Sequence, residues 1–400
     1  MPMKQPAGKN HPDTIQLISS IHDLQKITPA WKQFLSEHAE HFSFWQDPEI
    51  IQYHLEKTGN AKPLIILLLH ENTIECVAPC LILETRLTFT FSVFHFPGPK
   101  VRLLKVLDSD FIFSRHADTY HCIETIFHVL KKQHSAFDLI LLENLTRSSR
   151  LYEQCKNNKF QIMNFKLTFT SPKTEKIRKH ILGDSYETWL ASLKGKTRGK
   201  IRRRVRSLYK KFPDRVEFLK TTKPSHVPDF LNAINTLFPK TWQAKTFGTK
   251  TRNSDRDIAF YQHIAERGWL RSYLIQIDRK PVAFLIGFQY NGVFHHAECG
   301  YDPAFSKSGV GSVLNFLALQ DLYKHDKPTE LNFGFGENEY KKILGNDSCD
   351  AYEARITSPG FWRVAVKLQR FLSSTEEALR SLVKKMNMET RLRKILKRKQ

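Results

Sequence analysis

One order of elements occurs twice along this chain of 400 residues, and it limits the fold more than any single motif. A strand, a tight polar turn, a strand, a helix and a strand follow one another near 64–142 and again near 270–335. The two turns, 71–72 and 278–280, consist of polar residues that favour chain reversal between paired strands. The recurrence is one of element order, without identity in sequence. It predicts two related α/β lobes, each with a mixed, mostly antiparallel sheet flanked by helices.

Hydrophobic spacing indicates the type of each element. The helix expected near 118–132 carries Ile123, Ile126, Phe127 and Leu130 at positions i, i+3, i+4 and i+7. Hairpins are expected at 64–70 with 74–84 and at 270–277 with 281–290, the latter extended by a strand at 292–300. Further helices are expected near 28–40, 47–58, 148–157, 194–211, 226–238 and 255–267, and further strands at 14–19, 137–144, 160–171 and 329–336.

These elements divide the chain into three segments. A polar, charged stretch at 172–185 separates an N-terminal lobe, 1–175, from a C-terminal lobe, 176–358. The tail, 359–400, begins with Pro-Gly, a turn signal. Apolar residues then recur at helical spacing and the chain ends in RLRKILKRK. The tail is therefore expected to form a basic amphipathic helix.

The charge of the chain favours anionic partners, since its formal net charge is +22. The stretch 196–211 holds nine basic residues and no acid, and the last forty residues hold 12 basic and 3 acidic residues. The N-terminus lacks the apolar core of a signal peptide, and no run of about 18 apolar residues predicts a spanning helix. The six cysteines are scattered, without a CxxC pair. This usage is typical of a reducing compartment, so we expect a cytoplasmic protein.

The stretch YDPAFSKSGVG, 301–311, lies between an expected strand and an expected helix. A helix start presents backbone N–H groups without intrahelical partners and attracts anions. Glycines allow a phosphate to approach that backbone, although a Gly-x-Gly is more often a plain turn. The stretch is neither a P-loop nor a GxGxxG followed by a distant acid. We therefore predict a short pyrophosphate cradle, formed by Ser306, Ser308, Gly309, Val310 and Gly311.

These residues resemble the acyl-CoA cradle of GNAT-fold acetyltransferases, whose pattern is [QR]-x-x-G-x-[GA]. The second half more closely resembles cellulose-biosynthesis-type acetyltransferases, which are relatives of the Fem peptidoglycan aminoacyltransferases. Four stretches carry this likeness: WLASLKGKTRGKIRRRVRSL (189–208), Trp242 before a helix, DRKPVAFLIG (278–287), and YDPAFSKSGVG followed by LNFGFGENEYKKILG (331–345). The resemblance covers about 180–357, and the first half matches in architecture only.

The resemblance implies transfer of an acyl group from acyl-CoA, without a metal, to an amine or hydroxyl. The acceptor would be a sugar, a cell-envelope precursor or a related small molecule. One residue departs from the pattern: Ser306 stands where many acetyltransferases have Gln or Arg. The departure leaves the donor open, because Fem relatives use aminoacyl-tRNA, which the basic stretch 196–211 would also suit.

The acyl-transfer chemistry needs a base, a proton donor and groups that hold the substrates. Glu298 is the first candidate for the base and His296 the second, and strand alternation would place both on one face with Gly300. A salt-bridged glutamate and a packed histidine are the alternative readings. The resemblance places Tyr340 and Lys341 in the cleft, where Tyr340 would protonate the leaving thiolate and Lys341 would contact a phosphate or carboxylate.

Substrate contacts are expected from two further places. Arg198 and Arg202 share one stripe of the basic helix and are candidates to face an anionic substrate, as is Trp242 from the resemblance. Asp108 and Asp110 lie two residues apart, although a polar loop is the favoured reading there. The run HHAEC, 295–299, does not predict a metal site, because neighbouring residues on a strand point in opposite directions.

Three functions remain open from the sequence. An acyl-CoA-dependent acyltransferase is the leading hypothesis, and a Fem-like transferase that uses aminoacyl-tRNA is the second. The third is a non-catalytic binder of nucleic acid or of a membrane surface. The basic amphipathic tail suits the anionic inner face of a membrane, but coiled-coil or intramolecular packing explains it equally well.

Overall fold

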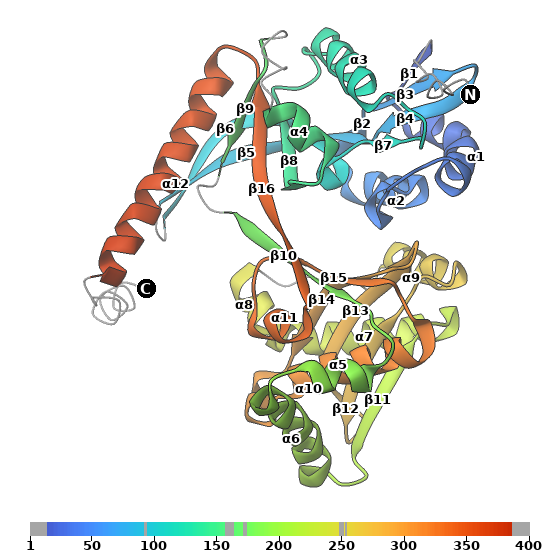
Figure 1. The fold of residues 1–400 in the computed structure, drawn as a ribbon, viewed down its shortest axis with the longest axis vertical. Coiled ribbons are helices and arrows are strands. Elements are labelled where there is room, and N and C mark those ends of the chain that lie inside the picture. Colours follow the sequence, from blue (N-terminus) through green and yellow to red (C-terminus); the bar gives the residue numbers. More distant parts are fainter. Residues whose placement is uncertain are drawn as a thin grey trace, which may run out of the picture. The chain divides into compact units, whose positions relative to one another are not determined.

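The computed structural model divides the chain into two compact units (Figure 1). Unit 1 comprises Met1–Thr174 and Asp350–Gln400, and unit 2 comprises Glu175–Cys349. The chain leaves unit 2 within one strand, β16 (Asp347–Thr357). The segment 350–400 therefore groups with the N-terminal unit, which its sequence did not indicate. The structure describes residues 14–91, 94–156, 164–170, 174–247, 252 and 254–385.

The first sheet of unit 1 is antiparallel, with the order β1-β3-β4-β7. Helices α1 (Ile21–Glu37) and α2 (Pro48–Thr58) cover one face, where Trp31 and Ile51 pack with Ile65 and Val77. The opposite face contributes Ile66 to a core shared with α3 (Thr119–Lys132). The strands are β1 (Thr14–Ile18), β3 (Ile65–His70), β4 (Thr73–Ala78) and β7 (Ile112–Phe113).

The second sheet of unit 1 has the order β2-β5-β6-β8-β16, and β9 also pairs with β16. Strands β6 and β8 are parallel and are joined through α3, whereas the other pairs are antiparallel. Helix α12 (Phe361–Lys385) packs on one face through Val366, against Leu87 and Val101 (Figure 1). The remaining elements are β2 (Ala61–Pro63), β5 (Cys80–Phe91), β6 (Phe94–Val106), β8 (Leu139–Thr146), β9 (Lys166–Phe169) and α4 (Arg150–Lys156).

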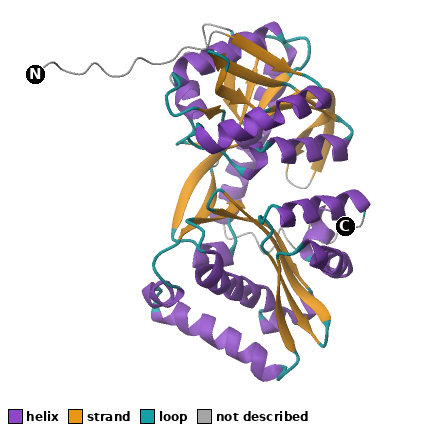
Figure 2. Cartoon of the chain, turned by 90° about the vertical axis from the view of Figure 1, so that its right-hand side faces the viewer, coloured by secondary structure: helices purple, strands orange, loops and turns teal. Residues whose placement is uncertain are grey.

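Unit 2 contains one sheet, with the order β11-β12-β13-β14-β15-β10. Its neighbours are antiparallel except for β14 and β15, which are parallel. Helices cover both faces (Figure 2). One face packs with α5 (Tyr186–Ser192), α6 (Gly195–Lys211) and α10 (Val310–Asp321), and the other with α7 (Val227–Leu237) and α9 (Asp255–Glu266). The strands are β10 (Glu175–Ile181), β11 (Val216–Thr221), β12 (Ser272–Ile277), β13 (Lys280–Tyr290), β14 (Val293–Tyr301) and β15 (Glu330–Phe335).

The predicted fold class is confirmed: two mixed α/β lobes contain mostly antiparallel sheets flanked by helices. The two expected hairpin turns are present, and Asn72 and Arg279 adopt left-handed conformations with φ of 65° and 59°. One local prediction was wrong. The strand expected over 74–84 is split at Pro79 into β4 and β5, which belong to different sheets. The polar segment 172–185 also contains a strand, β10, whose charged residues Arg178 and Lys179 pair with acids elsewhere in unit 2.

Candidate active site

A cavity of about 770 Å³ opens in unit 2 where two parallel strands separate. Strands β14 and β15 pair only from Val293 to His295 and from Glu330 to Asn332. Beyond these residues no further pairing of the two strands is present among the described residues, and the cavity occupies the gap. Its walls come from β14, from the start of α10, and from the segment between β15 and α11 (Glu339–Leu344). Such a gap admits a substrate between two strand ends.

A β-bulge in β14 decides which way the candidate catalytic side chains point. Gly287 of β13 pairs with His296, and the preceding Ile286 pairs with Glu298, so β14 carries one extra residue, Ala297. The bulge breaks the alternation of β14. His296 contacts α10, whereas Glu298 contacts a residue that precedes α9 on the opposite face. The prediction that His296 and Glu298 share a face is therefore wrong, although both line the cavity.

His296 is fixed by a short hydrogen-bond chain. Its Nε2 lies 2.8 Å from Oδ1 of Asn315, and Nδ2 of Asn315 donates to the carbonyl of Gly311 at 2.9 Å. Because the amide oxygen is the acceptor, Nε2 of His296 carries the proton and donates it. Burial lowers the pKa of His296 to about 4, so the ring is neutral at pH 7. The imidazole stacks on Tyr340, with ring centroids 5.5 Å apart and planes at 28°.

Tyr340 presents a protonated phenol beside a thiol. Its Oη lies 3.8 Å from Sγ of Cys299 on β14. Burial raises the pKa of Tyr340 well above its usual value, and burial raises that of Cys299 to about 11. Both groups therefore keep their protons at neutral pH. A phenol held in this state can donate a proton to a strongly basic atom that forms next to it.

Glu298 forms an ion pair with Arg252, and the pair lies largely out of solvent. The side chains of Arg252 and Glu298 are 12% and 22% exposed. The backbone N–H of Arg252 donates to Oδ1 of Asn235 at 2.9 Å, and its guanidinium lies over the ring of Phe238, 5.7 Å from the centroid. These contacts fix the guanidinium, which holds the carboxylate of Glu298 in place at the cavity wall.

The stretch predicted to form the cradle includes the start of α10. Gly309 is its N-cap residue, with φ 65° and ψ 28°, and supplies no side-chain cap. The N–H groups of the first turn, from Val310 to Ser312, have no acceptor within the helix. A Cβ at Gly311 would lie only 2.8 Å from Cδ1 of Tyr301, so this position requires glycine for close packing.

Two cations of α6 reach the cradle. Nη1 of Arg204 donates to Oγ of Ser312 at 3.0 Å, and Nζ of Lys211 donates to Oγ of Ser308 at 3.5 Å. The cradle thus combines open N–H groups, a helix dipole and guanidinium charge. This donor set fits the pyrophosphate of an acyl-CoA, whose two anionic phosphates would lie against the helix start.

Some of the remaining predicted residues line the cavity and others do not. Ser306 and Trp242 line the cavity, the latter 63% exposed, whereas Arg198 and Arg202 do not. Arg198 donates to the carbonyl of Ala191 at 2.8 Å, and Arg202 is exposed. Of the predicted site residues, the cavity is lined by Trp242, His296, Glu298, Ser306, Gly309, Gly311, Tyr340 and Lys341.

Lys341 lines the cavity but is already engaged. Its Nζ donates to the carbonyls of Phe335 and Gly334, at 2.9 and 3.3 Å, and its pKa is lowered by burial. The ammonium therefore holds the end of β15, where Gly334 has a positive φ of 69°. This contact fixes one lip of the cavity.

Sequence reasoning missed four residues of the site: Arg204, Arg252, Cys299 and Asn315. A signal existed for Arg204, because the apolar residues Ile201, Val205 and Leu208 mark the packed face of α6 and Arg204 lies on its edge. Asn315 is the lone polar side chain in the buried run Val313–Phe316. Arg252 carries no local signal, since its pairing spans 46 residues.

Asp110 has a structural role in unit 1. Its carboxylate accepts hydrogen bonds from the N–H groups of Arg150 and Leu151, at 3.0 and 3.4 Å, where α4 begins. Burial raises the pKa of Asp110 to about 6. Asp108 adopts a left-handed conformation in the preceding turn, with φ 54°. These contacts agree with the loop reading of the two acids.

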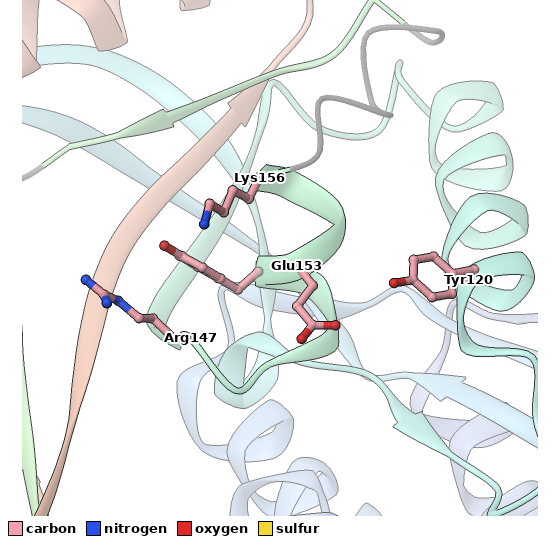
Figure 3. Close-up of a pocket in the computed structure, with 5 residues that line it drawn as sticks. Tyr120, Arg147, Glu153 and Lys156 are labelled. Atoms are coloured by element: carbon pink, nitrogen blue, oxygen red, sulfur yellow. The ribbon is translucent and has the colours of Figure 1, made fainter.

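A second hollow, of about 600 Å³, lies in unit 1 and is shown in Figure 3. Tyr120 reaches it from α3, Arg147 from the end of β8, and Lys156 from α4 (Figure 3). Nε of Arg147 donates to Oη of Tyr352 at 2.8 Å, and its guanidinium is largely exposed. No buried histidine or carboxylate lines this hollow. The groups suited to proton transfer are gathered instead in the cavity of unit 2.

In the part of the chain that the structure describes, no group of three or more His, Cys, Asp or Glu side chains is arranged to hold a metal ion. No helix there has the length and apolar character that crossing a bilayer requires.

Comparison with known proteins agrees with the geometry. Residues 195–342 match the model of a family described as an acetyltransferase (GNAT) domain. The match lies within unit 2 and spans less than half of the chain, so unit 2 resembles a GNAT acetyltransferase domain. The match includes the bulged strand β14, the cradle and Tyr340. No curated protein matches the chain in sequence.

Solved structures resemble the chain over most of its length. FemX aligns with a TM-score of 0.55 and 10% identity, over 86% of this chain and 96% of FemX. A conserved protein of unknown function from Bacteroides thetaiotaomicron aligns with a TM-score of 0.51 and 14% identity, over 86% of this chain and 100% of that one. At these identities the likeness shows the fold alone. The cellulose-biosynthesis subfamily stays a prediction.

Proposed function

We propose that the chain transfers an acyl group from acyl-CoA to an amine or hydroxyl in the cavity of unit 2. One observation carries the proposal. The open N-terminus of α10, capped by Gly309, faces the same cavity as the protonated phenol of Tyr340 and the carboxylate of Glu298. An anion-binding element and two proton-transfer groups are thereby combined in one site.

The donor would be held by backbone and cations together. The first-turn N–H groups of α10 would donate to the pyrophosphate, and Arg204 would add charge at the rim. Ser306, where many relatives have Gln or Arg, lines the cavity without a charge. We infer that Arg204, which reaches Ser312 from α6, supplies the positive charge that residue 306 lacks.

The acyl-transfer step assigns a role to each buried group. The acceptor's nitrogen or oxygen would bond to the thioester carbonyl carbon while the C–S bond breaks. Glu298, directly or through one water, would take the proton that the acceptor loses. Tyr340 would give its phenolic proton to the leaving sulfur, and solvent would then reprotonate it. Arg252 would hold the carboxylate of Glu298 in position for this step.

His296 fits a positioning role better than that of the base. With a pKa of about 4 it is a weak base at pH 7, and Asn315 already holds its Nε2 proton. Its ring supports the face of Tyr340. The stacking orients the phenol toward β14, where Cys299 lies.

A sugar acceptor is supported by exposed aromatic rings. Trp242, Tyr301 and Phe335 line the cavity and are 63%, 42% and 46% exposed. Exposed aromatic faces offer flat apolar surfaces on which a sugar ring can stack, while Glu298 can accept a hydrogen bond from a hydroxyl or ammonium. We propose a saccharide or cell-envelope precursor as the acceptor on this basis.

The donor assignment is tested by titration calorimetry with acetyl-CoA and a long-chain acyl-CoA. Ser312→Glu places a carboxylate on the first turn of α10, in the cradle. It should weaken binding by roughly 10- to 100-fold through repulsion of the pyrophosphate. Gln320→Glu adds the same charge to an exposed position near the other end of α10 and should leave binding unchanged. Equal affinity in Ser312→Glu and the unsubstituted chain would contradict the cradle.

Aminoacyl-tRNA is the second candidate donor, and the surface of α6 favours it. The helix contains no acid, and Arg202, Arg203 and Arg206 are exposed. Such a surface binds a nucleic-acid backbone in a strongly salt-dependent manner. Tight, salt-sensitive tRNA binding that Arg202→Gln/Arg206→Gln weakens, together with no affinity for either acyl-CoA, would replace the leading proposal by this one.

We propose a cytoplasmic site of action. The thiols of Cys76, Cys80, Cys122, Cys299 and Cys349 are free. Free thiols of this number are typical of a reducing compartment.

A further inference from the structure

Helix α12 carries an exposed apolar stripe along its whole described length. Its large exposed apolar side chains recur three, four or eight residues apart, spacings that keep them on one side of a helix. A soluble helix normally buries such a stripe. The exposed fractions are 64% for Phe361, 66% for Val364, 49% for Leu368, 63% for Phe371, 49% for Leu379 and 54% for Leu382.

The other side of α12 is fixed to unit 1. Val366 is fully buried in the cluster formed with strands β5, β6 and β8. Nε2 of Gln369 donates to the carbonyl of Thr88 on β5 at 3.2 Å, and Nη2 of Arg363 donates to the carbonyl of Thr357 at 3.2 Å. The helix cannot turn its stripe inward without losing these contacts, so the stripe belongs to the outer surface of unit 1.

A basic hollow of about 330 Å³ adjoins the stripe. Lys166 from β9 and Lys367 and Arg370 from α12 line it, together with Phe371 of the stripe, and its lining contains no acid. All three cations are exposed. Of the two acids in the described part of α12, Glu376 and Glu377, neither lines the hollow, and Glu377 lies two turns beyond Arg370 on the same side of the helix. Cationic and apolar groups therefore meet along one edge of α12.

This combination selects one occupant. An anionic lipid surface offers phosphates at the depth of the cations and acyl chains below them, which is how an interfacial amphipathic helix binds. A second copy of the chain fits less well, because a two-fold contact through the same edge would bring Lys367 and Arg370 against the same cations. The sequence after the described residues adds six further cations between 391 and 399.

A further exposed apolar side chain lies on a hairpin that contacts α12. The hairpin of β5 and β6 pairs Phe89 with Phe96, and Phe96 is 53% exposed. The hairpin contacts α12 through Thr88 and Gln369. An exposed phenyl ring on a strand bonded to the helix is what an interfacial contact would use.

We propose that α12 lies in the headgroup region of an anionic membrane, with its stripe toward the acyl chains and Lys166, Lys367 and Arg370 on lipid phosphates. This membrane-contact surface attaches unit 1 to the bilayer by its face and not by a spanning helix. The proposal is independent of the acyl donor, because every residue that carries it lies in unit 1. It makes a lipid-linked acceptor accessible to the chain.

The test is co-sedimentation of the full chain with vesicles of phosphatidylglycerol and phosphatidylcholine in equal amounts, and with phosphatidylcholine alone. The chain should bind the anionic vesicles and leave the neutral ones largely unbound. Leu368→Asp/Phe371→Asp should weaken binding by more than roughly tenfold. Lys367→Gln/Arg370→Gln should weaken it several-fold and reduce its salt dependence, since each cation near the surface contributes to the attraction.

A matched control separates the stripe from net charge. Ile15→Asp/Leu17→Asp introduces the same two acids at exposed apolar positions of β1, 49% and 37% exposed, in the same unit. This variant should bind like the unsubstituted chain. Failure of the unsubstituted chain to bind anionic vesicles would overturn the proposal, as would equal losses in the two aspartate pairs. A dimer that the stripe substitutions dissolve, without vesicle binding, would assign the stripe to a second copy instead.

Discussion

The two units contain the same strand–helix–strand connection, but the helix of that connection begins with a different N-cap residue in each unit. In unit 1, β6 and β8 are parallel and α3 lies between them in sequence; in unit 2, β14, α10 and β15 have the same arrangement. Helix α3 begins at Asp118, whose Oδ1 accepts from the N–H groups of Tyr120 and His121 at 3.1 and 3.3 Å. Helix α10 begins at Gly309, which has no side chain to do this.

The difference shows how one supersecondary unit serves two purposes. In unit 1 the chain's own carboxylate satisfies the helix start, which leaves no place for an external anion. In unit 2 the helix start stays open, and the strands beside it separate to form a cavity. Among the described residues, only unit 2 combines an open helix start with buried proton-transfer groups.

Removal of the phenolic hydroxyl in unit 2 should have the largest effect. Tyr340→Phe removes the proton donor for the leaving sulfur, so the rate of thiol release from acyl-CoA should fall by roughly 100- to 1,000-fold. Single-turnover assays with a thiol reagent measure this rate. Tyr152→Phe, the matched change in the hollow of unit 1, should leave the rate unchanged. A Tyr340→Phe chain with the full rate would remove the residue from the chemistry.

Acid should destabilise the chain through His296. Burial lowers the folded-state pKa of His296 to about 4, below the usual 6.5. Its contribution to stability is therefore present above pH 6.5 and is lost as the pH falls through about 4. Relative to His296→Gln, the free energy of unfolding of the unsubstituted chain should drop by roughly 3 kcal/mol between pH 7 and pH 4. Denaturant titrations at the two pH values measure the difference.

Asp110 in unit 1 should give the opposite pH dependence of stability. Burial raises the pKa of Asp110 from 3.8 to about 6, so its favourable contribution is present below pH 3.8 and is lost as the pH rises through about 6. Asp110→Asn should flatten this limb of the stability profile, whereas His296→Gln should flatten the other. If both substitutions alter the same pH range of the stability profile, the assignment of the two pKa shifts to Asp110 and His296 is contradicted.

The ion pair at the cavity should matter more than one at the surface. Glu298→Gln leaves the guanidinium of Arg252 largely buried and without its counter-ion, which should cost roughly 2 kcal/mol of unfolding free energy. Arg252→Met in the same chain should restore part of the loss. Asp350→Asn removes an acid that lies 3.8 Å from the exposed Arg147 and should cost under about 1 kcal/mol. Urea titration compares the three, and equal costs at the two sites would contradict the burial argument.

The N-cap residue of α3 should affect the stability of the chain and not its affinity for acyl-CoA. Asp118→Ala removes the acceptor for two N–H groups and should cost about 1 kcal/mol. Calorimetric titration should find acyl-CoA affinity unchanged in this variant. An altered affinity would mean that the helix start in unit 1 takes part in binding.

The architecture could be predicted from the sequence because the local signals agree with it. Polar turns at 71–72 and 278–280, and helical spacing in α3 and α10, indicate two lobes without further information. Strand β10 was not predicted because its sequence is rich in Lys and Arg. It pairs with β15, which is distant in sequence, and its cations Arg178 and Lys179 pair with acids there and beyond.

The parts of the candidate site that lie within one short stretch of sequence could be predicted. The cradle at 306–311 and Tyr340 follow strand and helix ends, so their place could be predicted. The direction of Glu298 could not, since a single inserted residue, Ala297, turns it away from His296. Arg252 joins the site from a segment that shows no helical or strand periodicity of its own.

The most direct measurement is an experimental structure of the chain with acetyl-CoA bound. The pyrophosphate should lie on the N–H groups of Val310, Gly311 and Ser312, with Arg204 beside it and the thioester sulfur near Oη of Tyr340. A pyrophosphate bound away from α10, or a thioester that does not enter the gap between β14 and β15, would contradict it.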